Sequence, residues 1–342
     1  MSIRYNKIPI TTDSGATIEA QSPVIVSAGR STDIPAFYSQ WFINRLNKGY
    51  TVWYNPFNQK PIYISLKDMR VVVFWSKNPK PLIPYLKELN DRGIHYYFQF
   101  TLNDYEKEGF EPNVPSLEER IHTFCQLSDL VGKEKVIWRF DPLILTDKIG
   151  IQELLRKIEN AGNQIKNYTQ KLVFSFADIG TYRKVQAGLK QYHIPYREFD
   201  EQTMKELARG LQQLNENWHF ELATCAEKIT LKEYDITKNK CVDDDLIIKL
   251  FSDDKVLMDF LGVKIIPGDI FNSNPTITKI RDNKDKGQRK ACRCISSKDI
   301  GMYNTCPHYC VYCYANTSKE AVKNNLALYD NKNESIISRN PR

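Results

Sequence analysis

The chain has 342 residues, of which 42% are hydrophobic and 26% are charged, and its formal net charge is +7. Such a chain can bury a large core in one big α/β domain or two smaller ones, which excludes a disordered chain or a miniature protein that depends on disulfides. The modest positive charge permits an anionic partner such as a nucleic acid without requiring one.

Residues 1–21 show no apolar signal core and no cleavage site, and no segment approaches the roughly 18 apolar residues of a membrane span. We therefore expect a cytoplasmic protein without a membrane partner. In a reducing compartment, cysteines more often bind metals or take part in catalysis than form disulfides. The eight cysteines of this chain are thus candidate metal ligands.

Seven short runs of β-branched and aromatic residues follow an N-terminal arm at 1–22. Their continuous apolar character is typical of strands buried on both faces of a parallel sheet. The intervals between them leave room for helices, and the apolar spacing in 117–130 predicts one that ends at Gly132. The predicted strands are 23–28, 51–55, 71–76, 94–101, 135–139, 172–176 and 218–224.

This alternation predicts an α/β fold, a full or partial (β/α) TIM-like barrel over residues 23–280. A Rossmann sheet would be expected to carry a glycine fingerprint, and the chain has none. The charged segment 281–290 predicts a loop or hinge before a cysteine-rich, cluster-binding tail at 281–342, which we expect to pack over the barrel mouth. In that tail Thr317 and Glu320 have capping-box spacing, which predicts a short helix to about Leu328.

Polar side chains stand at the ends of the predicted strands, where barrel enzymes place their reacting groups. The arginines and the lysine could hold a carboxylate or phosphate, and the aspartates could accept hydrogen bonds from ribose hydroxyls or an amine. Alternatively these groups pair with one another and brace the loops. The catalytic candidates are Arg30, Asp33, Lys77, Asn78, Arg139 and Asp141.

Three cysteines near the end of the chain, Cys306, Cys310 and Cys313, are spaced CxxxCxxC. A [4Fe–4S] cluster needs four ligands, so a loop that supplies three thiolates leaves one iron open for a small molecule. The spacing therefore predicts a catalytic iron–sulfur centre.

Four further cysteines could form a second metal site: Cys225, Cys241, Cys292 and Cys294. Four thiolates can hold either a second [4Fe–4S] cluster or a tetrahedral zinc ion, and the spacing does not choose between them. Alternatively, Cys225 and Cys241 are small buried hydrophobic residues. Cys125 lies on the apolar stripe of a predicted helix and is assigned to the core.

Taken together, several segments resemble a bacterial family of unknown function whose tail is described as similar to the radical S-adenosylmethionine (SAM) cluster motif. The likeness extends from about residue 22 to 316. The segments that carry it are SAGRSTDIPAFY (27–38), NPFN (55–58), VFWSKNP (73–79), FQFTLNDY (98–105), WRFDP (138–142), TCAE (224–227), CRC (292–294) and DIGMYNTCPHYCVYCYAN (299–316).

The resemblance implies that SAM binds the open iron and is cleaved to a 5′-deoxyadenosyl radical, which abstracts hydrogen from an unknown small-molecule substrate. Tyr312 would pack near the adenine and Asn316 would orient the loop. Asn55 and Asn58 occupy the position where such enzymes usually carry a Gly-Gly-Glu run. An external electron donor such as flavodoxin or ferredoxin would be needed. The cysteine loop follows all predicted strands, so the arrangement would be permuted.

Two other classes of function remain open. The cysteines could belong to a non-catalytic zinc or iron–sulfur protein, for instance a redox protein. The positive charge and many aromatic residues also allow a nucleic-acid repair or modification enzyme, although most of these aromatics lie in predicted strands rather than on a surface suited to stacking.

Overall fold

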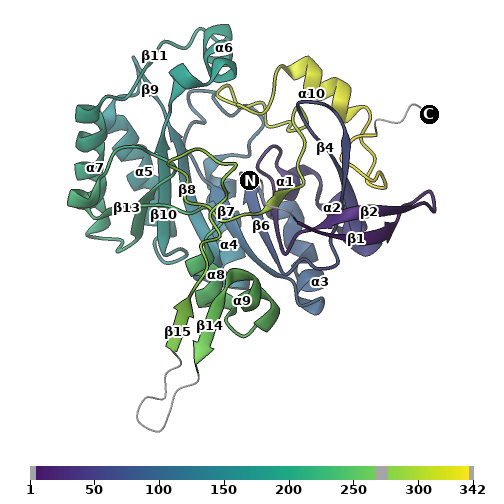
Figure 1. The fold of residues 1–342 in the computed structure, drawn as a ribbon. Coiled ribbons are helices and arrows are strands. Elements are labelled where there is room, and N and C mark those ends of the chain that lie inside the picture. The colour runs from purple at the N-terminus through teal and green to yellow at the C-terminus, as the bar shows by residue number, and fades with distance from the viewer. Residues whose placement is uncertain (1–4, 267–275, 339–342) are drawn as a thin grey trace.

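The computed structural model describes residues 5–266 and 276–338, which form an α/β fold around an eight-stranded parallel sheet (Figure 1). The order of strands in this sheet is β13-β12-β10-β8-β7-β6-β3-β16, and all neighbours are parallel. The strands are β3 (Ile25–Ala28), β6 (Val71–Ser76), β7 (His95–Thr101), β8 (Val136–Leu143), β10 (Lys171–Phe176), β12 (Glu221–Thr224), β13 (Ile236–Lys238) and β16 (Lys298–Asp299).

From β3 to β13 the strands stand in the sheet in the same order as in the chain. A (β/α) barrel has this order, whereas a doubly wound sheet reverses its order at a switch point. The predicted α/β class is confirmed. No strand ladder within 5–266 and 276–338 joins β13 to β16, so the closed barrel stays a prediction.

Six of the seven predicted strands lie in the parallel sheet, and the prediction for 51–55 was wrong about the partner. That segment is β4 (Tyr50–Tyr54), which pairs antiparallel with β5 (Pro61–Ser65). The connection at 55–60 is too short for the crossover that a parallel neighbour needs, so the chain makes a hairpin instead. Strands β13 and β16 were not predicted, because two or three residues carry too little periodicity.

The segment predicted as an N-terminal arm, 1–22, contains a second hairpin, β1 (Asn6–Thr11) and β2 (Thr17–Ser22). It joins β4 and β5 in a four-stranded sheet of order β1-β2-β5-β4, beside the parallel sheet (Figure 1).

The outward face of the parallel sheet is apolar along its whole length, with buried Phe74, Phe98, Trp138 and Phe174. Amphipathic helices cover this face, because each helix can bury one apolar stripe against it. The larger of them are α2 (Ser39–Lys48), α4 (Leu117–Val131), α5 (Ile151–Ile165), α6 (Arg183–Gln191) and α7 (Glu201–Asn215).

The inward face changes character along the strands. At the amino ends it is apolar and packs on α8 (Asp244–Phe251) and α9 (Lys255–Leu261). There His95 stacks on Phe251, with ring centroids 4.3 Å apart, and Asp254 pairs with Arg70 at 2.6 Å. The amino ends of the strands are thus closed, and the polar carboxyl ends are left for chemistry.

Two sequence predictions about helix ends can be compared directly. Helix α4 has the predicted extent, begins with a capping box of Ser116 and Glu119, and ends at Gly132. The C-terminal helix α10 (Lys319–Leu326) begins one residue later than predicted, because Ser318 rather than Thr317 caps it by accepting a hydrogen bond from the Ala321 amide, and it ends at Leu326 rather than at about Leu328. The remaining elements are α1 (Ile34–Phe37), α3 (Leu86–Asp91), β9 (Leu145–Thr146), β11 (Tyr196–Arg197), β14 (Val263–Ile266) and β15 (Thr276–Lys279).

The C-terminal segment returns across the sheet. Its strand β16 pairs with β3, and residues further on dock beside α2 and β4, where the Val52 amide donates to the Glu334 carbonyl at 2.8 Å. The indole of Trp41 donates to the Asn333 carbonyl at 3.0 Å. This segment is therefore packed against the N-terminal part of the fold.

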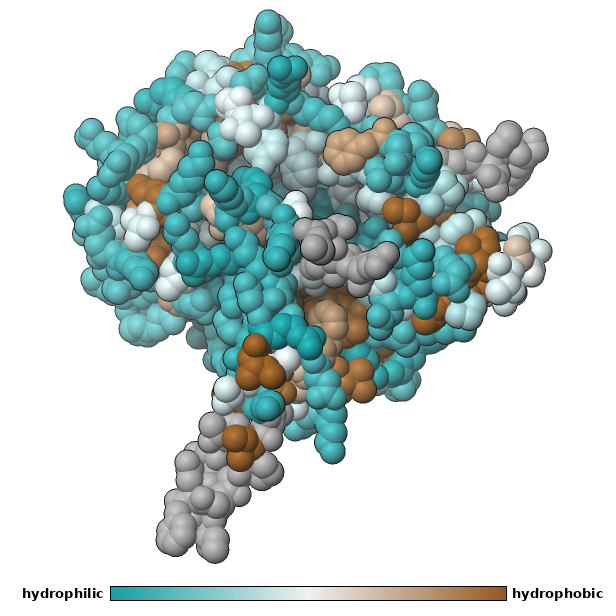
Figure 2. Space-filling view, viewed as in Figure 1, coloured by the Kyte–Doolittle hydropathy of each residue, from teal (hydrophilic) through white to brown (hydrophobic). Residues whose placement is uncertain are grey.

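The surface view shows a mostly hydrophilic face, with apolar side chains gathered where the β14–β15 hairpin leaves the body (Figure 2). In the part of the chain that the structure describes, no helix combines the length and apolar character that crossing a membrane requires.

Helix α6 contacts the cysteine-rich loop without room for a side chain. A Cβ at Gly188 would lie 2.1 Å from the carbonyl oxygen of Val311. We expect Gly188→Ala to displace the loop and destabilise the protein by about 1–3 kcal/mol, as overpacking usually does. Urea unfolding measures this. Gly180→Ala is the control, because its nearest neighbour would be at 3.4 Å, and equal midpoints for both variants would contradict the packing.

Candidate functional site

The loop that carries Cys306, Cys310 and Cys313 lies over the carboxyl ends of β3, β6 and β7. The amide of Val311 donates to the carbonyl of Phe110, in the loop after β7, at 2.9 Å. The predicted tail thus covers the end of the sheet where the polar side chains gather, and it brings its three thiols there.

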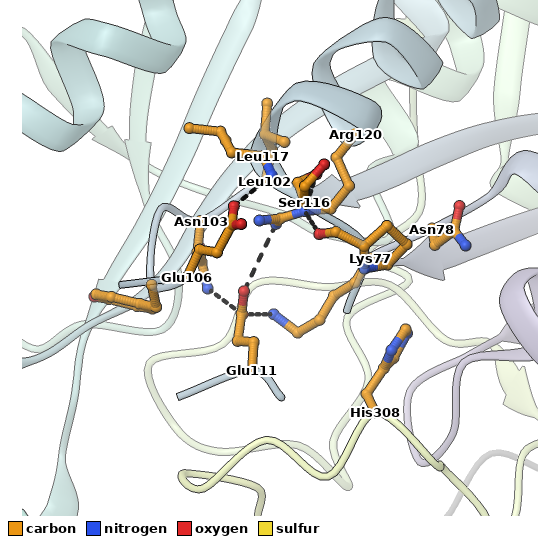
Figure 3. Close-up of polar contacts among 12 residues, drawn as sticks. Lys77, Asn78, Leu102, Asn103, Glu106, Glu111, Ser116, Leu117, Arg120 and His308 are labelled. Carbon is orange, nitrogen blue, oxygen red and sulfur yellow. Dashed lines mark hydrogen bonds and ion pairs between the residues drawn. The ribbon is translucent and has the colours of Figure 1, made fainter. Parts of the chain in front are cut away.

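Lys77, at the end of β6, binds this loop through a buried network (Figure 3). Its Nζ lies 2.6 Å from the Glu111 carboxylate and 3.0 Å from the Tyr312 hydroxyl. Glu111 also accepts a hydrogen bond from Asn103 Nδ2 at 3.1 Å and lies 3.6 Å from Arg120. One carboxylate therefore faces two buried cations, and the loop tyrosine donates to it as well.

The charges of this network shift each other's pKa. Burial alone would raise the pKa of Glu111, but Lys77, Arg120 and the hydroxyl of Tyr312 lower it to about 2. Burial alone would lower the pKa of Lys77, but Glu111, with Cys310 nearby, raises it. Both groups are therefore ionised at neutral pH.

Asp33 joins the first strand end to the same loop. Its carboxylate caps α1, accepts from Ser76 Oγ at 2.7 Å and from the Lys77 amide at 2.8 Å, and contacts His308 Nε2 at 2.8 Å. Asn78 lies beside it and donates its amide to Ser76 Oγ. Asp33, predicted as a ligand-binding residue, is thus fully engaged in positioning α1, β6 and the cysteine loop.

The thiols of the loop are set in a partly buried site. Burial raises the pKa of Cys306 to about 12, with Asp33 and Cys313 adding to the rise. Burial also raises the pKa of Cys310, but the Lys77 cation opposes it, as it does at Cys313. Lys77 therefore favours the thiolate form, which is the form that binds metals.

The predicted cofactor contacts lie close to the thiols. Tyr312 is buried, and its hydroxyl contacts Lys77, Asn103 and Glu111. Asn316 donates its amide to Cys313 Sγ at 3.3 Å and its Nδ2 to the Cys306 carbonyl at 2.8 Å. The predicted adenine contact of Tyr312 stays a prediction, and Asn316 is placed to orient the loop.

The other two predicted contacts, Asn55 and Asn58, lie in the β4–β5 turn rather than after a strand of the parallel sheet. Asn55 Oδ1 accepts from the Phe57 amide at 2.9 Å, and Asn58 Oδ1 accepts from the Lys60 amide at 3.1 Å. Both side chains shape that turn.

A second polar group occupies the inward face at the ends of β8 and β10. Arg139 forms an ion pair with Asp141, contacts Gln99 Oε1 at 3.0 Å, and donates to Cys241 Sγ at 3.1 Å. Asp141 also accepts from Ser175. Arg139 and Asp141 were predicted to pair in the alternative interpretation, and they do so while also contacting a cysteine.

Cys225, Cys241 and Cys294 also lie together, with Cys241 against Arg139 and Cys292 beside Cys294. Cys225 Sγ and Cys241 Sγ are 3.4 Å apart, and Cys294 Sγ accepts from the Cys241 amide at 3.2 Å. Hydrogen bonds from the Cys225 and Cys294 thiols hold the pKa of Cys241 well below its usual range, although burial opposes this.

Arg30 lies between the two cysteine groups. Its guanidinium stands 5.0 Å from the Trp75 ring centroid, and its carbonyl accepts from the Tyr314 hydroxyl at 2.6 Å. The Nε of Arg30 is buried and has no hydrogen-bond partner. The structure therefore brings all six catalytic candidates to one end of the sheet.

A cavity of about 710 Å³ opens beside the cysteine loop. Tyr54 and Phe57 of the β4–β5 turn, Tyr182 and Lys184 near the start of α6, and Tyr314 of the loop line it together with other residues. Lys184 is also close enough to lower the pKa of the Cys313 thiol. The cavity is thus aromatic and carries positive charge, and its wall includes Tyr314, the residue next to Cys313.

Sequence reasoning missed Glu111, Arg120, His308 and Glu227 as members of the site. The first two follow β7 at a distance from its end, and His308 lies inside the cysteine loop, where its spacing from the thiols indicates no role. Only Glu227 carried a signal, because the TCAE segment follows a predicted strand.

Glu227 lies at the carboxyl end of β10, where its carboxylate accepts a hydrogen bond from the Phe176 amide at 3.1 Å. Burial raises the pKa of Glu227 to about 7, opposed by the Phe176 amide and Arg289 and reinforced by Asp141 and Asp178. A carboxyl group with such a pKa can exchange a proton near neutral pH.

The buried network predicts a large stability effect. Glu111→Gln leaves Lys77 and Arg120 without their counter-charge, so we expect a loss of about 3–5 kcal/mol in the free energy of unfolding. Chemical denaturation measures it. Asp91→Asn, which removes an exposed ion pair with Lys87, is the control and should cost under about 1 kcal/mol. Similar losses in the two variants would argue against a buried network.

The raised pKa of Glu227 predicts that the stability of the fold depends on pH. Because its folded-state pKa of about 7 lies above the usual 4.5, its protonated form stabilises the fold below pH 4.5, and this contribution is lost as the pH rises through 7. Relative to Glu227→Gln, the wild type should lose stability between pH 5 and 8. Urea midpoints of both proteins at the two pH values test this, and parallel pH profiles would refute it.

Comparison with known proteins identifies the family. No curated protein matches the chain. Among solved structures, a truncated form of 3-deoxy-D-arabino-heptulosonate 7-phosphate synthase from Thermotoga maritima aligns over 76% of this chain and 94% of that chain at 14% identity, but its TM-score of 0.16 is too low to bear on the fold. A domain of unknown function, DUF1848, matches residues 25–315. The prediction of a family of unknown function is thereby confirmed, and the chain belongs to the DUF1848 family.

Proposed function

We propose that this protein is an iron–sulfur enzyme of the radical SAM kind, with its cluster held by Cys306, Cys310 and Cys313. The observation that carries the proposal is the position of these three thiols. They lie in one loop, next to Lys77, over the polar carboxyl ends of parallel strands. Such strand ends are where barrel-like enzymes carry out their chemistry.

The donor set fits a cluster better than a single ion. A tetrahedral zinc ion at about 2.3 Å from each sulfur requires the sulfurs to lie about 3.8 Å apart. Among the described residues, the only group of three or more His, Cys, Asp or Glu side chains whose ligand atoms lie within 4.8 Å of one another is Asp243, Asp244 and Asp245. The three loop sulfurs therefore do not lie as close together as a single zinc ion requires. A cluster spaces its thiolates more widely, because each binds a different iron.

When bound, a [4Fe–4S] cluster with three protein ligands would supply the electron that cleaves SAM to methionine and a 5′-deoxyadenosyl radical, and this radical abstracts a hydrogen atom from the substrate. The electron would come from an external donor such as ferredoxin or flavodoxin. The protein's own residues hold and shield this site. Glu111 and Lys77 hold the loop through Tyr312, and Asp33 holds it through His308.

The cavity beside the loop is our proposed site for SAM. Its volume of about 710 Å³ is in the range of small-molecule sites, roughly 300–1,000 Å³. Tyrosine rings offer surfaces for an adenine, and Lys184 and Arg183 offer positive charge for a carboxylate. The substrate would then approach from the inward face, where Arg139, Asp141 and Glu227 stand.

The test is to purify the protein anaerobically, reconstitute it with iron and sulfide, and add dithionite and SAM. We expect a brown protein that releases 5′-deoxyadenosine. Cys310→Ala should lose this release by at least about 100-fold, because the cluster would lack one of its three ligands. Cys125→Ala is the matched control, since Cys125 lies on α4 away from the loop. A colourless protein, or a brown one inert toward SAM, would overturn the proposal.

A further inference from the structure

The four cysteines outside the loop come from both edges of the parallel sheet. Cys225 directly follows β12, and Cys241 follows the edge strand β13. Cys292 and Cys294 precede β16, the strand at the opposite edge. Segments far apart in the chain thus meet at this point, and the amide of Ile295 donates to the carbonyl of Val242 at 3.1 Å.

The surroundings of these thiols differ from those of core cysteines. Cys241 Sγ receives hydrogen bonds from Arg139 at 3.1 Å and from Asn239 Nδ2 at 3.3 Å. Cys294 Sγ receives them from the amides of Cys241 at 3.2 Å and Val242 at 3.5 Å. Two buried hydrophobic thiols would not attract two N–H donors each, whereas metal-bound thiolates are regularly oriented by such donors.

The buried positive charges around these thiols also favour a metal centre. Arg139 is buried at 3% exposure, and the buried Nε of Arg30 has no hydrogen-bond partner. Both guanidinium groups face the thiols, with Asp141 and Asp299 as their carboxylate neighbours. Buried cations need anionic partners. Four thiolates around a metal centre carry a net negative charge, which Arg30 would help to offset, since Arg139 is already paired with Asp141.

We infer that Cys225, Cys241, Cys292 and Cys294 hold a second metal centre, ligated by thiolates alone, that joins the two edges of the parallel sheet. The Cys225 and Cys241 sulfurs, 3.4 Å apart, have nearly the spacing that one zinc ion requires, whereas the four sulfurs are not all within 4.8 Å of one another, so analysis of the metal decides between zinc and a cluster. In the described residues no strand pairing joins β13 to β16. Coordination of the metal by these cysteines would connect the end of β13 to the start of β16.

This inference does not depend on the proposed function, because either cysteine group can bind metal without the other. Two variants remove a ligand of the second centre: Cys294→Ser at a buried position and Cys292→Ser at a half-buried one, the latter as a safeguard against misfolding. Cys125→Ser is the control for the loss of any cysteine, and Cys310→Ala removes a ligand of the loop.

Metal and acid-labile sulfide are measured on the full chain, purified anaerobically and checked by circular dichroism. If both groups hold [4Fe–4S] clusters, each ligand variant should lose about half of the iron and sulfide, whereas Cys125→Ser loses none. A loss of about one zinc per chain, with the iron of the loop unchanged, would also support the centre and identify its metal as zinc.

Hydrogen exchange tests whether the second metal centre holds the segment before β16 in place. Amides of residues 283–299 should exchange faster in Cys292→Ser than in the wild type, and those of α4 should not change. The inference is overturned if the metal content of both Cys292→Ser and Cys294→Ser equals that of the wild type. It is also overturned if the native protein contains a disulfide between Cys225 and Cys241, whose sulfurs are 3.4 Å apart.

Discussion

The Glu111 carboxylate is the point on which the candidate site depends. It is the counter-charge that Lys77 and Arg120 share in a buried environment, and it accepts a hydrogen bond from Tyr312 of the cysteine loop. Buried charges are tolerated only when paired and hydrogen-bonded. Since Lys77 ends β6 and Arg120 lies on α4, this single anion joins sheet, helix and loop, and the position of Cys310 follows from it.

The sheet explains why the loop of Cys306, Cys310 and Cys313 lies where polar side chains converge. Its amino ends are closed by α8 and α9, whose apolar side chains pack on the inward face. At the carboxyl ends that face becomes polar, with Gln99, Arg139 and Asp141. The C-terminal segment crosses this end. The loop cysteines therefore lie over the carboxyl ends of the strands, although they come after all of those strands in the chain.

Much of this arrangement could be predicted from the sequence. Six predicted strands were correct because continuous apolar runs identify strands buried on both faces. The strand-end residues Arg30, Lys77 and Asp141 were predicted to meet because parallel strands end at one edge. The strand at 51–55 was assigned to the wrong sheet, because periodicity identifies a strand and does not identify its partner.

The secondary structure of the longer elements and the spacing of the three loop cysteines follow from the sequence alone, because both depend on neighbours within a few residues. The contacts by which Glu111 and His308 hold the loop, and by which Cys225, Cys241 and Cys294 meet beside Arg139, are visible only in the folded chain. These contacts join residues separated by long stretches of chain. Local pattern carries no information about them, because they arise when separate strands and loops pack together.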